Sequence, residues 1–129
     1  MKDAGILAVR AVGGALLAGH GAQKLFGAFA DKSISFADKP ELWAGGVIEF
    51  VCGIAIATGM LTRWAALLAS GTMAVAFFQF HLGANLSPSH WLPIVNKGEL
   101  AVMYCFVFLF VATRGPGLAS IDRALGLDE

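Results

Sequence analysis

The chain has 129 residues, of which 57% are hydrophobic and only 14% are charged, with 9 basic and 9 acidic side chains. Globular proteins average about 45–50% apolar and about 25% charged residues, so this is not the composition of an ordinary soluble domain. The even charge balance gives no reason to expect nucleic acid as a partner. Residues 64–96 contain no Lys, Arg, Asp or Glu. Because about 18 consecutive apolar residues suffice for a membrane helix, the sequence indicates an integral membrane protein.

Four apolar segments follow one another along the chain, and a polar tail comes after them. They cover residues about 4–26, 42–61, 64–81 and 98–113, and the tail covers 114–129. At about 1.5 Å per residue, each segment is nearly long enough for a hydrocarbon core about 30 Å thick. Backbone groups in lipid must be satisfied internally, and the alternating pattern of a membrane barrel is absent. The sequence predicts a single all-α domain over residues 1–129, an integral membrane up-down four-helix bundle.

The first segment ends in "LAGHGAQKLFG", residues 17–27, and is followed by "AFA", residues 28–30. The second stretch has the small-x-small pattern of a signal-peptide cleavage site. However, Arg10 interrupts the apolar region that a signal peptide needs, and residues 20–24 stand between that region and the site. We therefore expect the first segment to be retained as a membrane helix.

The second segment is preceded by "DKPE", which offers Asp38 as an N-cap, Pro40 in the first turn and Glu41 three residues after the cap. A tight connection around Thr62 joins it to the third segment, which predicts an antiparallel pair. A polar tail follows the fourth segment, and its residues from Ser120 fit a short amphipathic helix.

The basic residues divide unequally between the two sides of such a bundle. Those on the side of the termini are Lys2, Arg63, Arg114 and Arg123, and those on the opposite side are Lys32, Lys39 and Lys97. Cytoplasmic loops of membrane proteins carry the excess of Lys and Arg. We expect a multi-pass protein of the cell inner membrane with its termini in the cytoplasm.

Polar residues within the segments collect at the other side of the membrane, away from the termini. They are His20, Gln23 and Lys24 at the end of the first segment, Glu49 about 10 Å into the second, His81 at the end of the third and Glu99 at the start of the fourth. An ionisable group at membrane depth costs several kcal/mol unless it is paired, so such groups face the interior. We predict a pocket at one leaflet, lined by His20, Lys24, Glu49, His81 and Glu99.

Each of these polar residues also has a purely structural interpretation. Lys24 can extend its amine to the membrane surface, and Arg10 can reach a lipid phosphate. His81 fits an interfacial position, and Glu99 fits the first turn of a helix, where the dipole favours a carboxylate. Glu49 lies too deep and is too short to reach the surface. It either pairs with a cation such as Lys24 or stays protonated.

Three stretches of the sequence resemble motifs of the DoxX family of small four-helix membrane proteins. They are "HGAQKLFG" at 20–27, "AGGVIEFVCGIAIATGMLTRWAA" at 44–66 and "GELAVMYCFVFLFVATRGPGLASID" at 98–122. Three motifs in order on four membrane segments make the resemblance specific. It implies the fold predicted above. Relatives in this family include the membrane subunit of a thiosulfate:quinone oxidoreductase and a member of a mycobacterial membrane complex with superoxide dismutase and a sulfurtransferase.

The resemblance and the polar pocket together suggest a subunit of a membrane oxidoreductase that uses quinone. Quinone carbonyls need hydrogen-bond donors and then protons as they are reduced. The candidate quinone-binding residues are His20, Gln23, Lys24 and His81, and the candidate catalytic residues are Glu49, His20 and Glu99. No haem, flavin or metal-binding motif is recognised, because Cys52 and Cys105 lie far apart and no dinucleotide fingerprint occurs.

Two other functions remain open at this point. The protein could be a non-catalytic partner that recruits a redox enzyme or forms a homo-oligomer, with the polar cluster serving as structure. It could also provide a path for protons or small solutes. A through-path is less favoured, because the side of the termini offers no polar chain besides Arg10.

Overall fold

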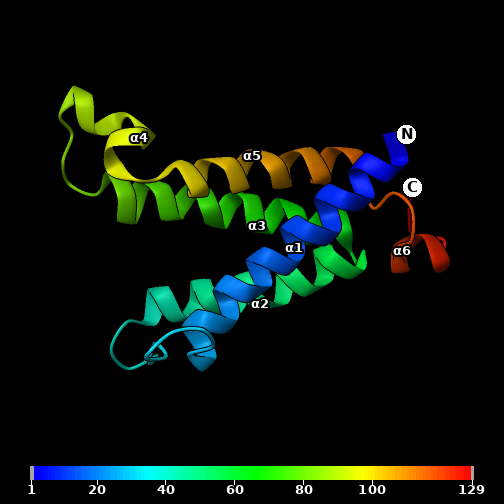
Figure 1. Ribbon diagram of the computed structural model, residues 1–129, viewed down its shortest axis with the longest axis horizontal. Helices are drawn as coiled ribbons and strands as arrows, with labels where there is room; N and C mark the ends of the chain where they lie inside the picture. The colour runs from blue at the N-terminus through cyan, green and yellow to red at the C-terminus, as the bar shows by residue number, and fades with distance from the viewer. Residues whose placement is uncertain (1, 129) are drawn as a thin grey trace.

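The computed structural model describes residues 2–128, and every regular element in that range is helical (Figure 1). The elements are α1 (Lys2–Phe26), α2 (Pro40–Thr58), α3 (Thr62–Ala76), η1 (Phe77–Leu82), η2 (Pro88–Trp91), α4 (Pro93–Asn96), α5 (Glu99–Arg114) and α6 (Ile121–Ala124). Of these, η1 is a π-helical turn that continues α3, and η2 is a 3-10 turn. The predicted all-α class is confirmed.

Within residues 2–128, three helices are long and apolar enough to cross a membrane. They are α1, α2 and the continuous helix Thr62–Leu82, which joins α3 and η1. The fourth expected segment, α5, has 16 residues, slightly fewer than the roughly 17–25 residues of a typical membrane helix. The structure thus supports a multi-pass membrane protein.

The ends of α2 differ from the predicted ones. Pro40 occupies the first turn as expected, but Lys39 is at the N-cap position and no side chain caps the helix. The prediction of Asp38 as N-cap is wrong. Because α2 begins at Pro40, the N-cap is Lys39, and Asp38 lies one residue too early for its carboxylate to accept from the free amides of the first turn. At the other end, Gly59 adopts a left-handed conformation with φ 74° and stops α2 before residue 61. The turn to α3 is therefore only three residues long.

The four long helices form two antiparallel pairs. α1 packs chiefly along α2, and α3 packs chiefly along α5. Figure 1 shows that the pairs meet at the end where the two termini and α6 lie, and diverge toward the end that carries η2 and α4. This divergence leaves room between the pairs at the end that carries the polar residues.

Glycines allow α1 and α2 to touch through their backbones. A Cβ placed on Gly14 would lie 2.7 Å from the carbonyl oxygen of Gly53, and a Cβ placed on Gly53 would lie 2.7 Å from that of Gly14. A Cβ on Gly21 would likewise lie 2.7 Å from the carbonyl oxygen of Gly46. Side chains larger than hydrogen cannot fit at these positions without separating the helices. Such close contacts are typical of membrane helices, where apolar burial alone gives little association energy.

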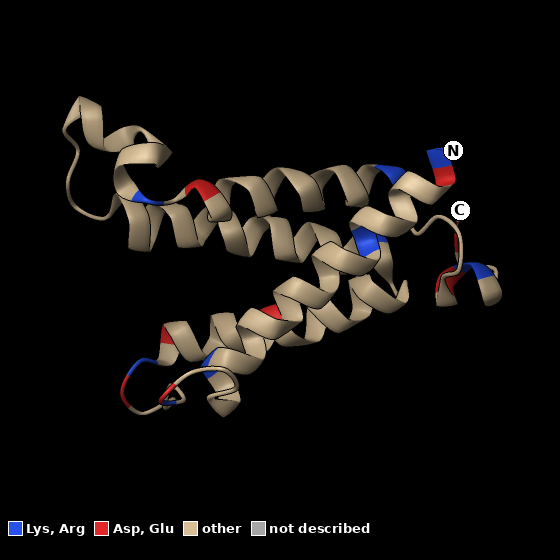
Figure 2. Cartoon of the chain, viewed as in Figure 1, with Lys and Arg blue, Asp and Glu red and all other residues tan. Residues whose placement is uncertain are grey.

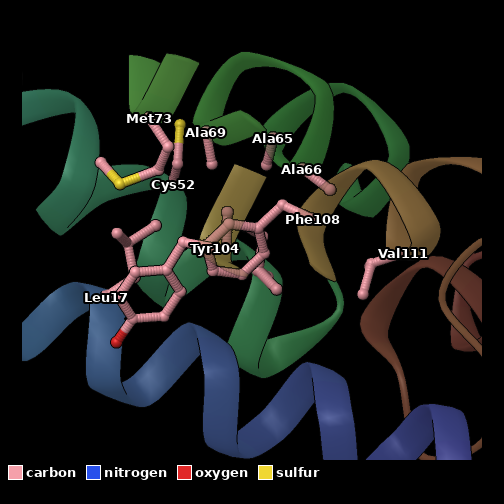
Figure 3. Close-up of a cluster of buried hydrophobic side chains, with 11 residues drawn as sticks. Leu17, Cys52, Ala65, Ala66, Ala69, Met73, Tyr104, Phe108 and Val111 are labelled. Carbon is pink, nitrogen blue, oxygen red and sulfur yellow. The ribbon is translucent and has the colours of Figure 1, made fainter. Parts of the chain in front are cut away.

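The hydrophobic core takes side chains from all four long helices (Figure 3). Alanines on one face of α3 pack against the larger Tyr104 and Phe108 of α5, whose rings stack with centroids 5.4 Å apart. Leu17 of α1 and Cys52 of α2 complete this cluster. Small residues on one helix face large ones on the next, which lets the helices pack closely.

Arg10 ties the polar tail to the helices at the end that carries the termini. Its side chain is fully buried. One terminal nitrogen donates to the carbonyls of Ile56 and Ala57 at 3.1 and 2.7 Å, and the other donates to those of Leu118 and Ala119, both at 3.0 Å. Arg10 therefore does not extend to lipid phosphate. It links the end of α2 to the tail.

Asp122 fixes the same tail to the start of α3. Its carboxylate accepts hydrogen bonds from the backbone N–H of Leu61 at 2.6 Å and of Thr62 at 2.8 Å. Burial by itself would raise the pKa of Asp122, but the hydrogen bonds from Thr62 and Leu61 and the positive charge of Arg10 outweigh burial and lower it. The tail therefore supplies the N-terminal cap that α3 lacks in its own sequence.

Candidate functional site

A cavity of about 250 Å³ lies between the two helix pairs at the end away from the termini. Its lining residues are Leu17, His20 and Lys24 of α1, Glu49 of α2, Met73 and Ala76 of α3, His81 of η1, Lys97 before α5, and Leu100, Ala101 and Tyr104 of α5. Four of the five residues predicted for the pocket thus line one cavity. They come together because helices of alternating direction bring the end of α1, the end of η1 and the start of α5 to one side, where they meet Glu49 from the middle of α2.

Lys24 and Glu49 form an ion pair on the wall of this cavity. The Lys24 Nζ lies 2.6 Å from the Glu49 Oε1. The Glu49 side chain is only 5% exposed, whereas Lys24 remains 29% exposed. A buried carboxylate is costly without a cation or donors, so pairing with Lys24 explains how Glu49 is tolerated in a membrane helix.

The close helix contact sets the length of this ion pair. Gly21 and Gly46, on the facing sides of α1 and α2, bring the two backbones together about one turn from Lys24 and Glu49. A wider helix separation would move the carboxylate away from the lysine amine. The glycines of "HGAQK" and "AGGVIE" are thus part of the site.

The Glu49 carboxylate retains unused capacity to accept hydrogen bonds. A carboxylate has about four acceptor positions, and Lys24 occupies one of them. The second oxygen, Oε2, is buried and has no partner among the groups of residues 2–128. A buried polar atom without a partner is uncommon and often marks a functional site.

Tyr104 and His20 lie side by side on the cavity wall. Tyr104 is the single tyrosine of the chain, and its side chain is 8% exposed. Its ring meets the His20 ring edge-on, with centroids 6.0 Å apart, while its other neighbour Phe108 stacks on it. These contacts hold the two rings in place, and both carry groups that can donate a hydrogen bond.

A polar network anchors the η2–α4 loop at the mouth of the cavity. The His81 Nδ1 lies 3.4 Å from the carbonyl oxygen of Asn96, and the His90 Nε2 lies 3.1 Å from that of His81. Asn96 donates to the His90 carbonyl at 2.9 Å and accepts from the Gly98 N–H at 2.9 Å. This network positions the following residue, Lys97, whose left-handed backbone (φ 61°) lets the chain turn into α5 at the cavity.

Gln23 and Glu99 do not line the cavity, contrary to the sequence-based expectation for the site. Gln23 donates weakly to the carbonyl of Phe29, at 3.5 Å, in the loop after α1. Glu99 is exposed in the first turn of α5. At 100° per residue, it lies about 140° around the helix from Tyr104, which faces the cavity.

Sequence reasoning missed Tyr104 and Lys97 as lining residues. A lone tyrosine in an otherwise apolar helix was a usable signal, because a buried hydroxyl needs a partner. Lys97 gave a weaker one, since a lysine at the end of a membrane helix usually extends to the surface. Only the left-handed turn at that residue brings it to the cavity.

The fold and the cavity define a class, a multi-pass helical membrane protein with a polar cavity at one end. A family model for DoxX matches residues 5–82, more than half of the chain. The chain therefore belongs to the DoxX family. The match ends at η1, so the third resembling stretch, residues 98–122, lies outside it.

A protein of Haemophilus influenzae, described as an uncharacterized protein, is similar to this chain. The two are 39% identical over 84 residues, which covers 65% of this chain and 61% of that protein. The chain thus spans less than two thirds of the length of its relative. No solved structure matches the chain.

Proposed function

We propose that this protein is a membrane component of a quinone-linked oxidoreductase system and that its cavity holds the quinone head group. The observation that carries the proposal is the Lys24–Glu49 ion pair on the wall of a cavity otherwise lined by Lys97, by the donors His20, His81 and Tyr104, and by apolar side chains. In this proposal, one carbonyl of the quinone ring accepts hydrogen bonds from Lys24, His20 and Tyr104. The other carbonyl accepts them from His81 and Lys97.

The residues fit such a ligand in both polarity and shape. Donors stand at the edge of the cavity, and Leu17, Met73 and Ala101 offer apolar contact for the ring faces. Binding sites for small molecules usually measure about 300–1,000 Å³, so a cavity of about 250 Å³ suits a ring rather than a whole lipid. A bound quinone would accept two electrons and two protons. Glu49 and Lys24 are the pair through which this chain would hold or move a proton.

The membrane placement belongs to the same proposal. We take α5 as the fourth span, since its 16 residues reach about 24 Å and the anchored loop before it extends its hydrophobic length. The four helices then form an up-down bundle in the cell inner membrane, with the termini in the cytoplasm. The basic residues near the termini, Lys2, Arg63, Arg114 and Arg123, support that orientation.

Binding of a short-chain quinone to the purified protein in detergent tests the proposal. We expect saturable binding by equilibrium dialysis that weakens at least tenfold in His20→Ala and Glu49→Gln. Glu41→Gln is the matched control, because Glu41 is an exposed carboxylate of the same helix and lies outside the cavity. When a reductant is added as electron donor, membranes that contain the wild-type protein should also reduce the quinone faster than membranes with either cavity variant. Absence of saturable binding to the folded wild-type protein refutes the proposal.

Loss of folding must be separated from loss of binding. The double variant Lys24→Met with Glu49→Leu replaces the ion pair by an apolar pair, which is often neutral or stabilising. We expect it to keep the helix content and thermal midpoint of the wild type but not the quinone. A double variant that binds quinone as well as the wild type would show that the pair does not serve the ligand.

A second candidate function is a non-catalytic partner that recruits a redox enzyme or a second copy of this chain. The observation in its favour is that the Lys24–Glu49 pair joins α1 to α2 and so has a structural role without any ligand. Under this reading no quinone binds, and the apolar double variant still co-purifies with the same partner as the wild type.

A further inference from the structure

A second hollow of the surface lies at the opposite end of the molecule, between α1 and α5. This groove has a volume of about 310 Å³. It is lined by Lys2, Gly5, Ile6, Val9, Phe110 and Arg114. Two basic side chains stand at its outer end and apolar ones along its length, and no acidic side chain lines it. Figure 2 shows basic and acidic positions together on the ribbon near both marked termini, so the absence of acidic side chains is specific to the lining of the groove.

The two basic residues of the groove differ from the other arginines nearby. Arg10 is committed to four backbone carbonyls, and Arg63 donates to the carbonyls of Ala112 and Thr113 at 3.0 and 2.8 Å. By contrast, Lys2 and Arg114 are exposed, and no ion pair within residues 2–128 involves either of them. Two like charges that share one groove repel each other, and an anion placed between them removes that repulsion.

The apolar part of the groove runs toward the membrane interior. Val9 and Phe110 are 38% and 49% exposed, and both lie one to two turns from the basic residues on their own helices. Gly5 leaves the floor of the groove open, because a Cβ placed on it would meet no atom within 4 Å. A charged end with an apolar extension matches an amphiphile better than a free ion.

We propose that this groove binds an anionic phospholipid, with the phosphate between Lys2 and Arg114 and the upper acyl chain along Gly5, Val9 and Phe110. Basic pockets between membrane helices are known to bind anionic head groups, and each Lys or Arg near the membrane surface contributes about a fivefold gain in affinity. The site is separate from the quinone cavity and does not depend on the proposed function. Lipid binding at this groove would favour the orientation in which the termini lie at the leaflet rich in anionic lipid.

Thermal unfolding of the full chain in neutral detergent, followed by tryptophan fluorescence, tests this site. The probes are phosphatidylglycerol, phosphatidylcholine with the same acyl chains, and inorganic phosphate. We expect only phosphatidylglycerol to raise the thermal midpoint, in a saturable way, because a ligand of the folded state stabilises it by mass action. The double variant Lys2→Gln with Arg114→Gln should need about thirtyfold more phosphatidylglycerol for half of the rise.

Two further variants separate a lipid site from general charge attraction. Gly5→Leu keeps both cations but fills the groove, and we expect it to abolish the response. Its matched control is Gly19→Leu, at another position of α1 where a Cβ meets no atom within 4 Å. The matched control for charge is Lys32→Gln with Lys39→Gln, two exposed lysines of the opposite loop.

The proposal is supported only if the groove variants lose the response and both controls keep it. Equal stabilisation by phosphatidylcholine would mean that the charges play no part. A rise with inorganic phosphate alone would replace the lipid by a free anion. Equal weakening in the Lys32 and Lys39 variant would reduce the effect to net charge. Each of these results overturns the proposal.

Discussion

Replacement of Arg10 by methionine tests how the polar tail is held against the helices. The wild-type side chain is fully buried and donates four hydrogen bonds, two to the end of α2 and two to the tail. Methionine has a similar length but no donor. The Ile56 carbonyl would keep the Gly59 N–H as a donor at 3.2 Å, and the Ala57 carbonyl would lose its donor. The carbonyls of Leu118 and Ala119 can turn to water if the tail detaches.

The expected loss of stability follows from the Ala57 carbonyl. An acceptor left unsatisfied in the interior costs about 1–3 kcal/mol. Removal of the buried guanidinium recovers part of that, because its Nε is itself buried without a partner. We expect Arg10→Met to lower the free energy of unfolding by about 1–3 kcal/mol.

Hydrogen exchange locates the effect as well as measuring it. The amide hydrogens of Leu61 and Thr62 bond to the Asp122 carboxylate, and the Asp122 N–H donates to the Gly59 carbonyl at 2.8 Å. In Arg10→Met these amides should exchange at least tenfold faster, while those in the middle of α3 stay protected. Arg63→Met is the control, since Arg63 is exposed and its loss should cost less than about 1 kcal/mol. Unchanged exchange in Arg10→Met would refute the idea that Arg10 holds the tail.

Three other outcomes are expected. Asp122→Ala should lower the free energy of unfolding by about 1–2 kcal/mol at pH 7. The pKa of Asp122 is lowered in the folded protein. The stability that its carboxylate contributes is therefore complete above the ordinary Asp pKa of about 3.9 and is lost as the pH falls through the folded pKa. Denaturation curves of variant and wild type should then converge in acid. Gly53→Ala should cost about 1–3 kcal/mol by forcing α1 away from α2, whereas Gly71→Ala, with open space around it, should cost nothing in the same unfolding assay. Tyr104→Phe should weaken quinone binding about three- to tenfold through loss of one hydrogen bond. Unchanged affinity in equilibrium dialysis would show that the Tyr104 hydroxyl does not contact the quinone.

The sequence alone determined the class of the protein and most of its helix positions. Long uncharged stretches can be stable only where lipid replaces water, and within lipid the backbone must form helices. Chain direction alternates between successive helices, so the helix ends that carry His20 and His81 had to meet on one side, and Glu49 in the middle of α2 faces the same cavity. That is why four of the five expected pocket residues line one cavity.

What only the tertiary structure decided is which face of each helix turns inward and what each charge contacts. Glu99 and Tyr104 stand on one helix, yet the packing of α5 against α3 turns only the tyrosine to the cavity. From the sequence, Arg10 could equally be assigned to a lipid phosphate. Only the structure shows that the tail, more than a hundred residues later, provides two of its carbonyl partners. A periodic pattern fixes angles within one helix. Contacts between distant segments depend on how closely the helices approach, which here is set by glycine backbones that touch.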